Sequence, residues 1–277
     1  MKPLDPPAIT YRSLYRTAIA QTQRNADRAI LAALEDRMVQ AGEDYDTTLA
    51  QNGPHAVTPI AFTASEEALV SALYEKRIRD KSGACRNIYE QILTSASHCP
   101  YCEDGEIYEV DHFLPQAGHH DLVMYPSNLV PICHPCNHIK LQTLPVSAQQ
   151  SFIHPYFDRL PTSRWLFARI DRQADGPVLN YWVQLDPLVH GALASRLNYH
   201  FSTLRLPERM RARSSKVLLE LQSNADEYLG ALGAEGLKLH FHDEGEKRFS
   251  WHGNTLEAAA YHAAATNDAF CAGEYRS

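Results

Sequence analysis

Two Cys-x-x-Cys pairs constrain this chain more than any other feature of its sequence. The first pair is Cys99-Pro-Tyr-Cys102, and the second is Cys133-His-Pro-Cys136. Two thiolates separated by two residues can bind the same tetrahedral ion, and two such pairs together are typical of a structural zinc site. We therefore predict that the four cysteines hold one structural Zn²⁺ ion. The alternative is a set of reduced thiols in the core.

The segment between the two pairs is longer than in the common zinc ribbon, where about 15–20 residues separate them. It contains an Asp111-His112 pair and an asparagine, Asn128, and a second asparagine, Asn137, directly follows the last cysteine. A zinc site that only stabilises the fold needs none of these residues. We therefore interpret the zinc as closing the base of a loop that carries chemistry.

This arrangement resembles the HNH, or ββα-metal, nuclease family. The resemblance rests on three features in this order: Asp111-His112-x-x-Pro115, then Asn128, then Cys133-x-x-Cys136-Asn137-x-x-Lys140. It implies that Asp111 and Asn137 bind a catalytic Mg²⁺ or Mn²⁺ ion, that His112 is the general base, and that Asn128 braces the loop that orients His112. The loop after Pro115 has one glycine, Gly118, where the family often has a pair. His138 remains an alternative metal ligand.

These residue types suit phosphodiester hydrolysis. A neutral imidazole titrates near physiological pH and can take a proton from water, so His112 suits the role of base. A hard divalent cation prefers oxygen ligands, and Asp111 and Asn137 supply a carboxylate and an amide oxygen. Because neighbouring residues of a strand point to opposite faces, we expect Asp111 and His112 to lie at a strand end or a bulge.

The segment His154-Pro-Tyr-Phe-Asp158 is similar to the helical exit of nucleases from bacterial anti-phage systems of the Septu type. That resemblance implies an antiviral defence effector gated by a partner ATPase or sensor protein. The main alternative is a non-catalytic zinc-stapled module that binds nucleic acid or protein. A zinc hydrolase is less favoured, because four thiolates leave no open position on the zinc for water.

The formal net charge of −7 does not by itself indicate nucleic-acid binding, although a local basic stripe is sufficient for it. We predict that DNA, in preference to RNA, contacts the five basic residues Lys140, Arg205, Arg209, Arg211 and Arg213. No apolar run approaches the roughly 20 residues needed to span a bilayer, and the first residues lack a signal-peptide pattern. The expectation is a cytoplasmic protein without a membrane partner.

Hydrophobic periodicity and turn residues predict an α+β protein in three regions. These are a helical N-terminal region over 1–92, a zinc-stapled core over 93–160, for which the resemblance implies the ββα-metal (HNH) fold, and a mixed region with a hairpin over 161–277. Within them we expect helices over 10–40, from 63 onward, and over 87–94, 193–204, 207–232 and 255–270. We expect a loop over 42–58, paired strands over 165–170 and 178–185, and a strand over 237–242.

Overall fold

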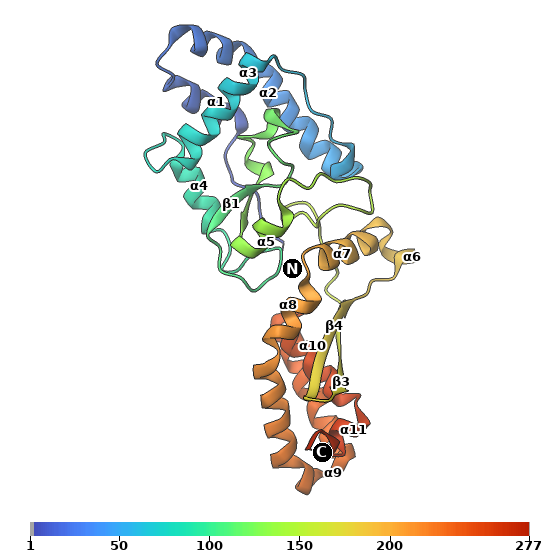
Figure 1. Ribbon diagram of the computed structural model, residues 1–277. Helices are drawn as coiled ribbons and strands as arrows, with labels where there is room; N and C mark the ends of the chain where they lie inside the picture. Colours follow the sequence, from blue (N-terminus) through green and yellow to red (C-terminus); the bar gives the residue numbers. More distant parts are fainter. Residues whose placement is uncertain (1–2, 277) are drawn as a thin grey trace. The chain divides into compact units, whose positions relative to one another are not determined.

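A computed structural model describes residues 3–276 of the protein (Figure 1). The chain divides into two compact units, residues 1–160 and 161–277. The predicted N-terminal region and the predicted zinc-centred core therefore lie together in the first unit. Helices are combined with two small antiparallel sheets, so the protein is of the α+β class.

The first unit contains one two-stranded sheet and the following elements: α1 (Tyr11–Ala20), α2 (Asn25–Gln51), η1 (Pro54–Ala56), α3 (Ala64–Leu73), η2 (Tyr74–Arg79), α4 (Arg86–Leu93), β1 (Glu109–His112), η3 (His120–Leu122), η4 (Pro126–Asn128), β2 (Leu129–Ile132) and α5 (His134–Lys140).

The single helix predicted over 10–40 is wrong, because the chain breaks after Ala20 and turns back as α2. The two helices pack against each other, and the buried hydroxyl of Tyr15 donates to the carbonyl of Leu31 at 2.9 Å. The turn brings the apolar stripe of α1 against the apolar stripe of α2. In one continuous helix these two stripes could not contact each other. Burial of both stripes therefore overrides the local helical pattern at the break.

The loop predicted over 42–58 is also wrong over most of its length, since α2 continues to Gln51. The buried residues of α2 recur every three or four positions as far as Leu49. Gly42, the first residue of the predicted loop, lies where the ring of Tyr125 packs onto the helix. A Cβ atom there would lie 2.5 Å from that ring, so the glycine makes room for it.

Two of the shorter predicted helices are confirmed. Thr63 caps α3 through a complete capping box, in which its side chain accepts from the Glu66 amide and Glu66 accepts from the Thr63 amide. Helix α4 matches the range predicted for it to within one residue at each end. It presents Ile88 and Ile92 to the core, next to the β1–β2 sheet.

Strands β1 and β2 form an antiparallel pair in which Asp111 lies opposite Val130 and His112 lies opposite Leu129. All residues of β2 are buried. Helix α5 begins two residues after β2 ends, so a two-stranded sheet is followed at once by a helix. His112 is the last residue of β1, as expected for a residue that shares a site with its neighbour Asp111.

The second unit contains the other sheet and the following elements: β3 (Leu166–Gln173), β4 (Gly176–Val183), α6 (Pro187–His190), α7 (Ala192–Thr203), α8 (Leu206–Arg213), α9 (Ser215–His252), α10 (Leu256–Ala265), α11 (Asp268–Cys271) and η5 (Glu274–Arg276). The predicted hairpin is confirmed as β3 and β4. One of its faces packs against α10 (Figure 1).

The strand predicted over 237–242 is wrong, because this segment lies inside α9. Leu237 and Phe241 are buried and four residues apart, whereas Leu239 between them is 62% exposed. The buried positions therefore recur with the period of a helix and not with that of a strand. No helix among residues 3–276 is long and apolar enough to cross a membrane.

Helix α9 is interrupted at Gly233, whose φ of 67° and ψ of 175° are not helical. Glycine is essentially the only residue that adopts this backbone region, so Gly233→Ala should destabilise the protein by about 1–3 kcal/mol. Gly230 is a matched control, because it lies in the helical part of α9 and a Cβ atom there meets no other atom within 4 Å. Gly230→Ala should stabilise by about 0.5–1 kcal/mol. Urea denaturation of both variants checks the opposite signs.

Candidate metal centre and active site

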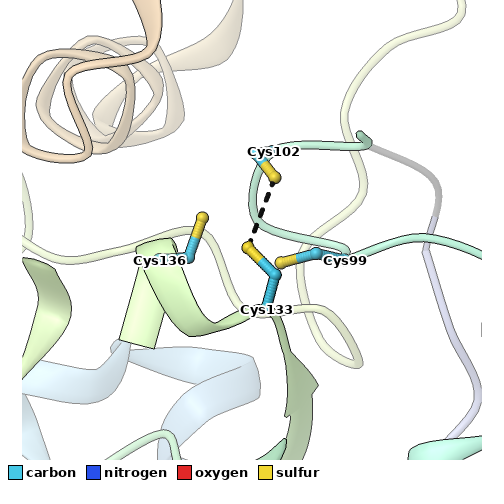
Figure 2. Close-up of side chains that lie close together, drawn as sticks. All are labelled: Cys99, Cys102, Cys133 and Cys136. Atoms are coloured by element: carbon cyan, nitrogen blue, oxygen red, sulfur yellow. Dashed lines mark hydrogen bonds between the residues drawn. The ribbon is translucent and has the colours of Figure 1, made fainter. Parts of the chain in front are cut away.

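The four thiols of the two Cys-x-x-Cys pairs converge on one point (Figure 2). All four are buried, their Sγ atoms lie within 4.8 Å of one another, and the Cys102 and Cys133 Sγ atoms are 3.8 Å apart. A zinc ion with Zn–S bonds of about 2.3 Å in a tetrahedron places its thiolates about 3.8 Å apart. The cluster is therefore positioned to hold one metal ion, and its geometry suits structural zinc.

The backbone around the first pair is folded tightly against the second pair. The Cys99 amide donates to the Gly105 carbonyl at 2.8 Å, and the Gly105 amide donates to the Cys102 thiol at 3.4 Å. A Cβ atom on Gly105 would lie 2.7 Å from the Sγ atom of Cys133. Glycine at this position therefore allows the two pairs to approach each other.

Helix α5 connects the metal centre to strand β1. Cys133 is the N-cap of α5 and Cys136 lies in its first turn, so the cluster fixes the start of the helix. From there, residues at intervals of three along the helix contact alternate residues of β1. The contacts are His134 and Asn137 with Glu109, and Lys140 with Asp111. Of the two predicted metal ligands, Asp111 therefore lies on the face of β1 that contacts α5, and Asn137 lies on α5 itself.

Lys140 lies at the other end of α5 and is fully buried. Its ammonium group donates to the Asp111 carboxylate and to the His112 carbonyl, both at 2.7 Å. Lys140 was predicted to contact nucleic acid, but its ammonium group is buried and does not reach the protein surface. The side chain instead holds the Asp111-His112 dipeptide against the helix.

Asn137 is oriented by Glu109, which lies two residues before Asp111 in β1. The amide nitrogen of Asn137 donates to one carboxylate oxygen of Glu109, and His134 Nδ1 pairs with the other oxygen at 2.8 Å. Burial raises the pKa of Glu109, but these two contacts outweigh it and the net shift is downward. Because its nitrogen is engaged, Asn137 keeps its oxygen as the free end of the amide. His138, the alternative ligand, stacks beside His134 with ring centroids 6.2 Å apart.

His112 is held in one tautomer. Its Nε2 atom lies 2.8 Å from the carbonyl oxygen of Val123, which can only accept, so Nε2 carries the proton. The ring packs edge-on against Tyr74 at a centroid distance of 4.5 Å. Burial lowers the pKa of His112, which favours the neutral imidazole. Nδ1 has no hydrogen-bond partner among residues 3–276 and is not completely buried. It is therefore accessible to a substrate or to water.

Asn128 is fully buried and braces the loop between β1 and β2. Its side-chain oxygen accepts from the Leu114 amide at 2.8 Å, and its nitrogen donates to the carbonyls of Leu114 and Leu122 at 3.1 and 3.2 Å. Leu122 immediately precedes Val123, whose carbonyl holds His112. The asparagine therefore fixes both ends of the loop segment on which the imidazole depends.

Tyr45 and His154 extend this buried network, and the sequence did not indicate either as a site residue. The hydroxyl of Tyr45 donates to Asn128 Oδ1 at 3.3 Å and lies 2.9 Å from His154 Nε2. His154 Nδ1 accepts from the Tyr156 amide at 3.0 Å. Tyr45 falls within the segment wrongly predicted as a loop. Its helical spacing from Met38 and Ala41 is the signal that could have identified it.

The remaining predicted residues are four arginines, which belong to the second unit of the chain. Arg205 precedes α8, and Arg209, Arg211 and Arg213 lie within it, all in the second unit. Asp111 lies in β1 and Asn137 in α5, and each contacts a residue of the other element: Asp111 contacts Lys140, and Asn137 contacts Glu109. Residues 154–158 form a turn in which the His154 amide donates to Asp158, in place of the predicted helical exit.

Comparison with known proteins identifies a relative in a bacterial virus. Over 198 residues, or 67% of its length, the chain is 33% identical to Protein ea31 of Escherichia phage lambda. The chain spans 62% of the length of that relative, whose name states no activity. No family model matches the chain. No solved structure matches it.

The thiol geometry predicts about one zinc ion per chain in the purified protein. Cys102→Ser should lower the bound zinc well below that value, because one of four ligands is removed. Cys271→Ala is the control, since Cys271 is also buried but lies outside the cluster. Elemental analysis by mass spectrometry of the folded proteins checks this. A Cys102→Ser variant with its full zinc content would refute the assignment of the cluster.

The Asp111–Lys140 pair predicts an asymmetric response to mutation. Asp111→Asn leaves a fully buried ammonium without its counter-charge, and we expect a decrease of about 3–5 kcal/mol in unfolding free energy. Lys140→Met leaves a carboxylate that is 18% exposed, so the decrease should be smaller. The double variant should be destabilised by less than the sum of the two. Chemical denaturation of the three variants measures the coupling, and additive effects would contradict it.

Proposed function

We propose that the protein is a metal-dependent endonuclease of the HNH type that hydrolyses phosphodiester bonds in DNA. The observation that carries this proposal is the state of His112. Its Nε2–H bond to the Val123 carbonyl leaves Nδ1 as an unprotonated nitrogen at the end of β1, directly beside Asp111. A structural zinc module has no need of an imidazole fixed in this way.

In the proposed reaction, His112 Nδ1 takes a proton from the attacking water. The Val123 carbonyl stabilises the protonated ring that results, since the Nε2–H bond to it strengthens when the imidazole becomes charged. The buried position of His112 keeps the imidazole neutral before the reaction. These three properties are those required of a general base that works near neutral pH.

Two oxygens suit a divalent cation. Asp111 Oδ1 and Asn137 Oδ1 have no hydrogen-bond partner among residues 3–276, whereas the other polar atom of each side chain is engaged by Lys140 or Glu109. Carboxylate and amide oxygens are ligands that Mg²⁺ and Mn²⁺ accept, with water completing the sphere. When bound, such an ion polarises the phosphate and stabilises the departing oxygen.

Lys140 and Asn128 prepare the site without taking part in the chemistry. Lys140 fixes the Asp111 carboxylate through Oδ2 and thereby leaves Oδ1 for the ion. Asn128 fixes the loop whose carbonyl at Val123 sets the His112 tautomer. A catalytic geometry held by packed, hydrogen-bonded partners reduces the reorganisation needed during the reaction.

The substrate and regulation follow from the resemblance and from charge. One base and one ion site per chain imply cleavage of one strand at a time. The net charge of −7 favours a protein that receives part of its grip on nucleic acid from a partner, such as the ATPase or sensor of a bacterial defence system. A non-catalytic zinc-stapled binding module is the second candidate, and the zinc cluster alone suits it equally well.

The deciding experiment is cleavage of supercoiled plasmid by the purified protein in Mg²⁺ or Mn²⁺. His112→Ala should reduce the rate about 10²- to 10⁴-fold, as is typical for loss of a general base. His55→Ala is the control, since His55 is exposed and lies in η1. Gel electrophoresis follows nicked and linear products. Equal rates for the parent and His112→Ala would remove His112 as the base, and a parent that cuts no DNA or RNA would favour the zinc module.

A further inference from the structure

The β3–β4 hairpin of the second unit has one buried face and one open face. The residues of the buried face lie against α10 and form part of the core: Leu166, Ile170, Leu179, Tyr181 and Val183. The pairing register places the alternate residues on the open face, starting with Phe167 opposite Trp182 and Arg169 opposite Asn180. Antiparallel sheets with one packed face usually carry polar residues on the other. Here the open face carries polar residues and, in addition, the large aromatic side chains of Phe167 and Trp182.

Two large aromatic rings stack on the open face. The Phe167 and Trp182 rings are nearly parallel, at 21°, with centroids 5.9 Å apart. Trp182 is 40% exposed. The pair therefore presents a flat apolar surface to solvent on a rigid two-stranded support. Such a surface is a stacking platform for another planar group.

Arginines surround this aromatic pair. Arg169 lies next to Phe167 on the same face, and its side chain is 69% exposed. Arg211 reaches over the face from α8 and donates to Gln173 at 3.0 Å and to Asn180 at 3.5 Å. Both hydrogen-bond partners of Arg211 are neutral, and its charge also acts on Asp171, whose pKa it helps to lower.

One carboxylate, Asp171, also lies on the open face and pairs with Arg169 at 2.8 Å. The hydrogen bonds that it accepts from Asn180 and Arg169 lower its pKa against the opposing effect of burial. Two arginines against one aspartate leave the face with a net positive charge, in a chain whose net charge is −7. An exposed arginine–aspartate pair is weak, so a phosphate can compete for Arg169.

We propose that this face, made of Phe167, Trp182, Arg169 and Arg211, binds single-stranded nucleic acid. Unpaired bases stack on the aromatic pair while the arginines contact the backbone phosphates, a combination that suits strands whose bases are free. A duplex hides its base faces and cannot use the platform. The choice of nucleic acid as the bound polymer rests on the proposed nuclease function. The inference also gives Arg211, one of the predicted basic residues, a specific role in binding.

The test measures binding without cleavage. The His112→Ala protein is titrated into a fluorescently labelled oligothymidine strand, and anisotropy gives the dissociation constant. Adding Trp182→Leu should weaken binding roughly 5- to 100-fold, the range expected for removal of one stacked base. Trp251→Leu is the matched control, because Trp251 is 73% exposed and lies in α9. It should leave the affinity unchanged.

Two further variants separate binding from folding. Trp182→Phe keeps an aromatic ring and should retain most of the affinity. Arg169→Gln together with Arg211→Gln should make the salt dependence of binding less steep. The negative slope of log affinity against log salt should decrease in magnitude by roughly 0.7 for each phosphate that the protein no longer neutralises. Circular dichroism and thermal melting confirm that each variant is folded.

Several results overturn the inference. They are unchanged affinity in Trp182→Leu, duplex DNA bound as tightly as the single strand, or no binding of the strand at low salt. These outcomes are independent of the plasmid assay. If the parent cuts DNA but the face binds no strand, the nuclease function stands and the inference is wrong. If the strand binds through Trp182 but nothing is cut, the inference stands and the proposed nuclease function is wrong.

Discussion

The convergence of four thiols on one point is the constraint on which the rest of the first unit depends. It joins chain segments in which Cys102 and Cys133 are 31 residues apart, and it fixes the start of α5 directly after β2. With that end held, the seven residues of α5 are laid along β1. A helix this short is not stable alone in water, so the metal centre and the contacts with β1 must supply its stability.

The charges at the far end of α5 follow from this placement. A buried ammonium is tolerated when it is paired and hydrogen-bonded, and Lys140 meets both conditions through Asp111 and the His112 carbonyl. The same contacts fix the dipeptide that carries the proposed chemistry. Glu109 acts similarly on Asn137, so each proposed metal ligand has a second residue that orients it.

A separate hydrogen-bonded network secures the loop on the other side of β1. Asn128 joins Leu114 and Leu122, while Tyr45 donates to Asn128 and contacts His154 in turn. Because unsatisfied polar groups are costly in a core, such a network specifies one loop conformation. It ties the position of the proposed base to α2, a helix that is remote in sequence from the zinc cluster.

The sequence predicted much of this site because its signals are local. The two cysteine pairs, the Asp111-His112 pair and the capping residue Thr63 are each recognisable within a few positions of the sequence. The errors arose where distant packing decides local structure. The segment from Gly42 onward was predicted as a loop, but Gly42 accommodates the Tyr125 ring within α2, and the alternation around Leu239 suggested a strand within α9.

The sequence by itself therefore determined the thiols of the candidate metal site, the α+β class and the candidate catalytic residues. Only the tertiary structure decided what those residues contact. Lys140 lies inside the protein and not on a nucleic-acid surface, because the buried end of α5 meets Asp111. Glu109 and Tyr45 join the site because the fold brings β1 under α5 and α2 beside the loop. These are contacts between remote segments, which no local spacing encodes.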